Sequence, residues 1–334
     1  MDIVIKSFNR AYYLDRCLKS IELFVKGFNG NILIVDDGTP KKYLQLLQNK
    51  YPFVKVIPTK NYLYKSNKLK SKEYTFKKNI PVADWSRVVA SVSDYVLILE
   101  EDFWFTKEFN LAETEQTCKA ENIALLKMFW LQNNVLVQSK NEKTFGNVIL
   151  YEPDVVTKNS FLYRLVFAKH NKLLRKFFTL LGFYSNEKEL NYYSLYSVAG
   201  AIFKKDYFLH IWNNASENVN EKEQIIKSLE FFNNSKQQRL AKTKTEPLTT
   251  GFISSSFEKV NGDEFSMHDF NVTLNEYWFY NQNAFLEDFE EDISTDFIQS
   301  ILKEKCKSDR YISEWINWVS NFKESYRKIG CIVK

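Results

Sequence analysis

Short apolar runs alternate with helical patterns along the first hundred residues, and this alternation constrains the fold more than any other feature. The apolar runs cover residues 3–5, 32–35, 54–57 and 95–99. Between the first two runs, apolar residues follow the spacing of one helix face at Leu14, Leu18, Ile21, Val25 and Phe28. Continuous apolar strands are typical of parallel sheets that are buried on both faces. The pattern predicts an α/β fold with a mostly parallel central sheet and helices on both faces.

The alternation weakens beyond residue 110. Helical segments are expected at 111–120 and 160–184, and further strands at 123–131, 148–151 and 198–203. The lysine-rich residues 59–80 have no apolar period and are expected to form a loop. Acidic and then aromatic residues at helical spacing predict a C-terminal helical appendage over 283–334, after a domain that covers 1–282.

The composition restricts the functional class. The 334 residues are 45% hydrophobic, enough for a full core, and the net charge is only +5, which does not indicate a nucleic-acid-binding protein. The sequence contains no run of eighteen apolar residues, the length needed to span a membrane. The start, M-D-I-V-I-K, lacks the charged-then-apolar pattern of a secretion signal. Four well-separated cysteines are read as reduced thiols, so we expect a cytoplasmic protein.

Polar residues follow three of the early strands. The first strand is followed by K-S-F-N-R, the second by D-D-G at 36–38, and the fourth by E-E-D at 100–102. In open parallel sheets, ligands bind beyond the carboxyl ends of the strands, so we expect these segments to form one cleft. The three adjacent carboxylates also need a positive partner, because a carboxylate beside an apolar core costs free energy unless it is neutralised.

Three segments, in this order and spacing, resemble the opening signatures of family 2-type glycosyltransferases with the GT-A fold: I-V-I-K-S-F-N-R, I-L-I-V-D-D-G-T-P and Y-V-L-I-L-E-E-D. The intervening A-D-W-S-R-V-V-A-S-V-S-D-Y is similar to the helix that precedes the acidic triplet in that family. V-A-G-A-I-F-K-K-D-Y-F at 198–208 is a looser match. The resemblance covers residues 2–105 well, and it implies a nucleotide-sugar-binding half over 1–110 and an acceptor half over 111–282.

The resemblance implies that a divalent cation, Mn²⁺ or Mg²⁺, supplies the positive charge and bridges the carboxylates to the diphosphate of the donor. It makes Asp102 the direct ligand, with Glu100 facing the same way and Glu101 the opposite way. The family usually has Asp where Glu100 stands, so Glu100 could instead act through water or contact the sugar. His268 is a further candidate ligand, although most lone histidines bind no metal. A solvated turn or a helix N-terminus is the alternative for the acids.

The same resemblance describes the donor site, with a UDP-sugar favoured. One carboxylate of the D-D pair is implied as a contact of the uracil or the ribose. The expected donor-binding residues are Ser7, Asn9, Arg10, Asp36, Asp37, Arg87, Glu100 and Glu101. Alternatives remain open, since Asp-Gly is a favoured turn pair and either arginine could lie on the surface.

The second half is expected to supply the acceptor site and a general base. Inverting transfer needs a carboxylate that takes the proton of the acceptor hydroxyl as its oxygen attacks the anomeric carbon. The resemblance places this acid after the strand at 198–203, where Glu221 and Glu223 stand. Asn220 and Glu223 also have the spacing of a capping box, which favours Glu221 as the base. The expected acceptor-binding residues are Trp104 and Gly200. A single aromatic residue is, however, more often part of the core.

Residues 160–184 place apolar residues at helical spacing among basic ones. A basic amphipathic helix can lie on an anionic membrane surface, and this would suit a lipid-linked acceptor on the inner face of the membrane. A helix packed over the acceptor cleft is the alternative.

These observations predict a metal-dependent, inverting glycosyltransferase that moves a hexosyl or hexosaminyl residue from a nucleotide-diphosphate sugar to a glycan or lipid-linked acceptor. Surface polysaccharide or glycolipid synthesis is the expected setting. A nucleotidyltransferase is less consistent with the sequence, because K-S-F-N-R lacks the glycine of a phosphate-binding loop. The remaining alternative is a degenerate, non-catalytic GT-A domain that binds a glycan or a protein partner.

Overall fold

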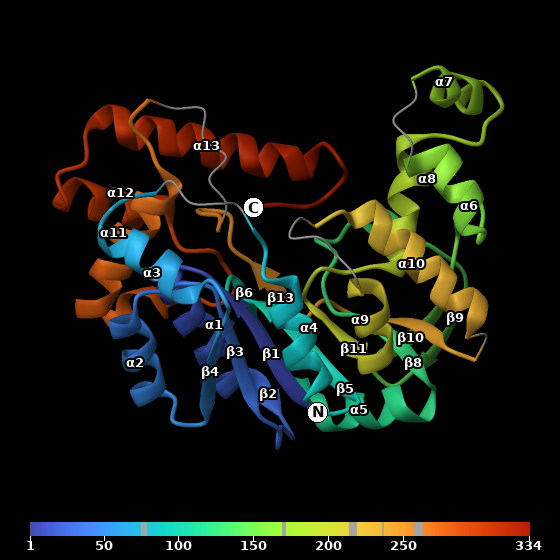
Figure 1. Ribbon diagram of the computed structural model, residues 1–334, viewed down its shortest axis with the longest axis horizontal. Helices are drawn as coiled ribbons and strands as arrows, with labels where there is room; N and C mark the ends of the chain where they lie inside the picture. The colour runs from blue at the N-terminus through green and yellow to red at the C-terminus, as the bar shows by residue number, and fades with distance from the viewer. Residues whose placement is uncertain (75–78, 169–171, 214–218, 236, 257–262) are drawn as a thin grey trace.

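The computed structural model describes residues 1–74, 79–168, 172–213, 219–235, 237–256 and 263–334 (Figure 1). The main strands are β1 (Asp2–Ser7), β3 (Ile32–Asp36), β4 (Val54–Pro58), β5 (Tyr95–Glu100), β8 (Ile123–Lys127), β9 (Ser139–Phe145), β10 (Val148–Pro153), β11 (Ala201–Lys204) and β12 (Arg239–Thr243). Within the described ranges these nine strands form one sheet in the order β4-β3-β1-β5-β11-β8-β12-β10-β9.

The first four of these strands in the chain, β1, β3, β4 and β5, pair in parallel, and so do β8 and β12. β11 joins β5 to β8 by antiparallel pairing, and β10 and β9 extend the far edge in the same way. Every residue of β1 and β3 is buried, as expected of strands that are covered on both faces. The predicted α/β fold and the parallel pairing of the early strands are confirmed.

The path of the chain explains how helices come to cover both faces. α1 (Ala11–Phe24) and α2 (Lys41–Lys50) lie on connections that move outward from β1 to β3 to β4, and α4 (Val82–Ala90) lies on the connection that returns to β5. Right-handed crossovers in opposite directions place helices on opposite faces. α11 (Met267–Tyr280) packs against α1 and α2, while α9 (Lys205–Trp212) packs against α4 and α10 (Glu221–Asn234).

The expected loop at 59–80 is wrong for residues 62–70, because α3 (Tyr62–Lys70) forms there. Residues 75–78 lie outside the described residues. The inward side of α3 includes Lys65 and Ser66 beside Leu69, all three buried. A helix whose buried face is partly polar shows no apolar period, so its sequence looks like that of a solvated connection.

The basic segment at 160–184 is helical in three pieces. These are α6 (Ser160–Tyr163), the π-helix η2 (Arg164–Ala168) and α7 (Lys172–Leu180), and residues 169–171 lie outside the described part. α7 projects from the body at the upper right of Figure 1. Across the described residues, no helix combines the length and the apolar character needed to cross a bilayer.

The C-terminal residues are helical, as expected, and they pack onto the body. α12 (Thr295–Glu304) is followed by α13 (Asp309–Arg327), which begins at a Ser308 cap. The Trp315 indole donates a hydrogen bond to the Ile253 carbonyl at 2.9 Å, and the Tyr326 ring lies 5.4 Å from that of Phe252. The adjacent Gly251 N–H donates to the Asp102 carbonyl at 3.0 Å. α13 therefore lies close to the carboxyl end of β5.

Candidate active site

The carboxyl edge of the parallel strands brings the predicted segments together. The strand register aligns Ser7 with Asp36 of β3, and Lys6 with Glu100 of β5. The Asp37 N–H donates to the Ser7 carbonyl at 2.9 Å, and the Glu101 N–H donates to the Lys6 carbonyl at 3.1 Å. The three polar segments thus meet at one edge, as predicted from their positions after the strands.

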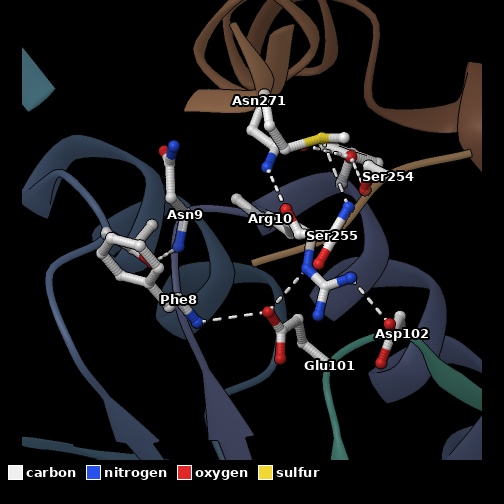
Figure 2. Close-up of polar contacts among 12 residues, drawn as sticks. Phe8, Asn9, Arg10, Glu101, Asp102, Ser254, Ser255 and Asn271 are labelled. Atoms are coloured by element: carbon white, nitrogen blue, oxygen red, sulfur yellow. Dashed lines mark hydrogen bonds and ion pairs between the residues drawn. The ribbon is translucent and has the colours of Figure 1, made fainter. Parts of the chain in front are cut away.

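The acidic triplet has its counter-ions within the chain. Lys6 Nζ lies 2.7 Å from Glu100 Oε1, Arg10 Nε lies 2.8 Å from Glu101 Oε1, and Arg10 Nη1 lies 2.6 Å from Asp102 Oδ2. Figure 2 shows Arg10 between Glu101 and Asp102, and Glu101 also accepting a hydrogen bond from the Phe8 N–H at 3.2 Å. The first strand and the residues after it therefore provide the positive charge for the acids at the end of β5.

The electrostatics of this cluster follow from burial and incomplete neutralisation. Burial raises the pKa of Glu101 to about 7 and raises that of Asp102, although Arg10 lowers both. Burial also acts to raise the pKa of Glu100, but the Lys6 ammonium brings it below its ordinary value. Three carboxylates share two cations, so the cluster has one surplus negative charge when all three are ionised, which for Glu101 requires a pH above about 7.

One oxygen of the cluster fits a metal ion. Asp102 Oδ1 is buried and has no hydrogen-bond partner among the described residues, while Oδ2 is bound to Arg10. No group of three or more His, Cys, Asp or Glu residues in the described part of the chain is arranged around one metal position. The residues therefore fit an ion that takes one ligand from Asp102, with Glu100 nearby, and most of its ligands from elsewhere.

Asp36 and Asp37 occupy different environments. Asp36 closes its own turn, because Oδ1 accepts from the Gly38 and Thr39 N–H groups at 3.0 and 2.7 Å and Oδ2 accepts from the Thr39 hydroxyl at 2.7 Å. Burial nevertheless raises the pKa of Asp36 to about 6. Asp37 pairs with Lys65 of α3, and the Thr59 hydroxyl donates to it at 2.6 Å. Asp36 thus matches the turn alternative, whereas Asp37 forms an ion pair with a helix that follows β4.

Asn9 is held in an unusual conformation beside these carboxylates. Its φ of 55° lies in the left-handed region, which Asn tolerates better than most residues. Its amide oxygen accepts from Asn275 at 3.0 Å, but its Nδ2 is buried with no hydrogen-bond partner in the described residues. The His268 ring packs edge-on against Phe8 at 5.8 Å. His268 is therefore positioned against the segment that follows β1.

Glu221 shares two neighbouring tyrosines with the acidic triplet. The Tyr193 hydroxyl donates to Glu221 Oε2 at 2.7 Å. The pKa of Tyr326 is raised to about 12, by burial first and then by the negative charges of Asp102, Glu100 and Glu221. Burial, followed by the charges of Glu221 and Glu100, also raises the pKa of Tyr196. The charges of Glu221 and of the acids at the end of β5 therefore act on the same two tyrosines.

Two other predicted residues form ion pairs elsewhere. The Glu223 side chain is 40% exposed and pairs with Arg164 at 3.2 Å. Among the described residues, the Asn220 side chain makes no capping hydrogen bond, so the capping box suggested by the spacing does not form. The Arg87 side chain is 60% exposed and pairs with Asp84 one turn earlier in α4 at 2.9 Å. It matches the surface alternative.

The acceptor-binding role expected of Trp104 is wrong for its side chain, whereas that of Gly200 stays a prediction. Trp104 is fully buried, its indole donates to the Phe289 carbonyl at 2.8 Å, and Arg16 stacks on its ring at 4.5 Å. No face remains for a sugar, because the side chain two residues after Asp102 points into the core. Gly200 has a φ of +65°, and a Cβ there would lie 2.8 Å from the Phe103 ring. Close packing between strands therefore explains this glycine.

A cavity of about 690 Å³ opens between α4 and α9 and is lined in part by Ser86, Asp206 and Trp212. The Trp212 ring meets that of Trp85 at 5.7 Å, and Lys6 Nζ lies over the Trp85 ring at 4.4 Å. Tryptophans thus separate the cavity from the acidic cluster.

Sequence reasoning missed four residues that shape the site. Lys6 belongs to the polar segment expected after the first strand but is not assigned a role there, and Lys65 lies in the expected loop. Tyr196 and Tyr326 carry no local motif, since their importance depends on contacts between distant segments. A lysine directly before polar chemistry at a strand end is the one signal that could have been used, because strand interiors rarely bury an unpaired charge.

No protein-family model and no curated protein matches the chain. Solved structures do match the chain. S. aureus TarS 1–349 matches with 12% identity over 97% of this chain and 80% of that chain, with a TM-score of 0.42. It has also been solved in complex with UDP-GlcNAc. Against the longer S. aureus TarS structure, the chain spans 49% of that protein.

Glucosyl-3-phosphoglycerate synthase from Mycobacterium tuberculosis, solved with Mn²⁺, UDP and phosphoglyceric acid, matches with 13% identity over 72% of this chain and 66% of that chain, with a TM-score of 0.37. The galactosyltransferase LgtC, solved with donor and acceptor sugar analogues, matches with 19% identity over 45% and 57%, with a TM-score of 0.29. These TM-scores are low, so we base the function on the residues of the site.

Proposed function

We propose that this protein is a GT-A glycosyltransferase that moves a sugar from a nucleotide-diphosphate donor to a hydroxyl group of a glycan or lipid-linked acceptor. The proposal is supported by the buried acidic triplet at the sheet edge that also carries Asp37 and Asn9, and by Glu221, whose charge acts on Tyr196 and Tyr326 together with charges of the triplet. A carboxylate on the acceptor side and a charge-binding site on the donor side are the two elements that such a transfer needs.

The donor would bind at the carboxyl ends of β1 and β3. Asn9 Nδ2 is buried without a partner in the described part of the chain, so it offers a hydrogen bond to the base or ribose of a nucleotide. Asp37 and Lys65 form a second polar group at the same edge. A UDP-sugar is the donor that the sequence resemblance favours.

The leaving diphosphate would meet the acidic cluster. Asp102 would hold a Mn²⁺ or Mg²⁺ ion, with Glu100 as a supporting ligand, and such an ion would offset the negative charge of the diphosphate. Arg10 fixes the orientation of Asp102, and Lys6 fixes that of Glu100, through the ion pairs at 2.6 and 2.7 Å. The two cations thereby keep the carboxylates in place before the donor arrives.

Glu221 would act as the general base of an inverting reaction. Its carboxylate is held by the Tyr193 hydroxyl at 2.7 Å, which leaves the other oxygen available to take the proton of an acceptor hydroxyl. Glu223 is engaged with Arg164 on the surface. Of the two acids predicted from the sequence, Glu221 is therefore the one we assign to this role.

A thermal-shift panel of nucleotides and nucleotide sugars with Mn²⁺ tests the donor site. We expect UDP or a UDP-sugar to raise the melting temperature of the wild type, and Asp102→Ala to remove most of that shift. Arg87→Ala is the control, because its side chain lies on the surface. The absence of stabilisation by any nucleotide would contradict the donor assignment.

One observation favours a second candidate, the non-catalytic GT-A domain. The internal ion pairs of Arg10 and Lys6 satisfy much of the acidic cluster without a ligand. Hydrolysis of the donor separates the two functions. Metal-dependent release of the sugar from a bound UDP-sugar supports the enzyme, whereas binding without any turnover supports the non-catalytic domain.

A further inference from the structure

The helix α7 turns an apolar face outward. Phe177, Leu180 and Leu181 are 54%, 86% and 50% exposed, and their spacing of three and four residues puts them on one side of the helix. Phe178 lies on the other side and packs against the core of the protein. The helix is therefore anchored to the body by one face while its apolar face meets solvent.

The same segment is rich in positive charge. Residues 160–184 contain five Lys or Arg residues and no Asp or Glu, so this stretch accounts for a charge equal to the formal net charge of +5 of the whole chain. Lys176 is exposed, and Arg175 stacks over the Tyr184 ring at 4.9 Å. Lys169 lies outside the described residues. The surface around α7 thus combines exposed apolar side chains with a local excess of positive charge.

We propose that α7 docks the protein on an anionic lipid bilayer, with Phe177, Leu180 and Leu181 inserted among the lipid chains. Single exposed apolar residues are common on protein surfaces, but an apolar helix face among cations is the pattern of helices that lie in a membrane interface. Anionic lipids attract such cations, and a nine-residue helix needs this attraction because its apolar area is small. A second copy of the chain would bring the same positive charge, so charge favours the membrane over self-association.

The orientation that results is consistent with the proposed function. In Figure 1, α7 lies on the same side of the molecule as α13, whose Tyr326 packs against Phe252 close to Asp102. Docking through α7 would therefore turn that side toward the membrane. Only this consequence rests on the proposed glycosyl transfer, and it favours a lipid-linked acceptor.

Vesicle flotation of the full chain, without nucleotide or acceptor, tests the docking. We expect the protein to float with vesicles of phosphatidylcholine and phosphatidylglycerol, and to stay at the bottom with phosphatidylcholine alone. Leu180→Glu should lower the partition coefficient at least about tenfold, because it removes an inserted apolar side chain. Lys176→Gln should lower it about fivefold, because one cation near an anionic surface is lost.

The matched control is Leu63→Glu, the same substitution at a leucine of α3 that is 72% exposed, and it should float like the wild type. Equal melting temperatures of the variants show that all of them are folded. Three results would overturn the proposal: flotation of Leu180→Glu at the wild-type level, equal binding to neutral vesicles, or light scattering that shows a dimer which Leu180→Glu dissociates. None of these depends on catalysis, so failure of the docking is distinguishable from failure of the proposed function.

Discussion

Replacing Arg10 with methionine tests how the acidic cluster is neutralised. Arg10 is 3% exposed and is the partner of two carboxylates, Glu101 and Asp102, whose side chains are 4% and 13% exposed. Removing one partner of a buried ion pair typically costs about 3–5 kcal/mol, because the remaining charge is left in a poorly solvating site. Methionine keeps most of the apolar stem, so we expect a loss of about 3–5 kcal/mol that arises from charge and not from a cavity.

Urea unfolding followed by tryptophan fluorescence measures this loss, with an unchanged m-value as the check that both states are comparable. At a pH high enough to ionise Glu101, the second variant, Arg10→Met with Glu101→Gln, should recover about 1–2 kcal/mol, because one uncompensated charge is gone. Arg87→Met is the control and should cost less than about 1 kcal/mol, since its pair with Asp84 is exposed. A loss below about 1 kcal/mol for Arg10→Met, or strict additivity with Glu101→Gln, would refute this account of the cluster.

Other substitutions test the base, the packing and a buried lysine. Glu221→Gln should abolish sugar transfer while donor binding stays at the wild-type level, as measured by product formation and calorimetry. Gly200→Ala should lower the free energy of unfolding by about 1–3 kcal/mol in urea titrations, because of the positive φ and the 2.8 Å approach to Phe103. Burial lowers the pKa of Lys127 to about 7. Above pH 7 the unfolded state therefore binds more protons than the folded state, and the free energy of unfolding should rise by about 2–3 kcal/mol from pH 7 to pH 9. Lys127→Met should remove this rise. If the free energy of unfolding of the variant depends on pH as in the wild type, Lys127 is not the group responsible.

The parallel strands could be predicted because their apolar residues are continuous, which is a local property of the sequence. α3 could not, since its buried face includes Lys65 and Ser66, and the helix depends on a partner, Asp37, that lies in a different layer. The convergence of the polar segments could also be predicted, because parallel strands present their carboxyl ends at one edge of the sheet.

Side-chain direction was the weaker part of the prediction. Trp104 follows the acidic triplet closely in sequence, but the short strand β6 (Phe103–Phe105) that carries it is buried throughout, so its neighbours in the chain do not show which side it faces. Tyr326, by contrast, lies far from the triplet in the sequence but near it in space, because it comes from the last helix, and no motif surrounds it. Pairwise contacts between distant segments decide both cases, and a pattern along the chain does not contain them.

The charge count of the cluster leads to an expectation about the order of binding. Asp102 offers one unpartnered oxygen within the described residues, and its other oxygen is bound to Arg10. A divalent ion needs about six oxygen ligands and is repelled by the nearby guanidinium, so the ion alone should bind weakly. A nucleoside diphosphate supplies phosphate oxygens as ligands, and its negative charge offsets the repulsion by the guanidinium. Calorimetry should therefore detect little heat with Mn²⁺ alone, and an affinity for UDP that rises at least about tenfold when Mn²⁺ is present, which corresponds to a coupling of about 1.4 kcal/mol. Tight binding of Mn²⁺ without nucleotide would mean that Arg10 does not hold Asp102 in solution.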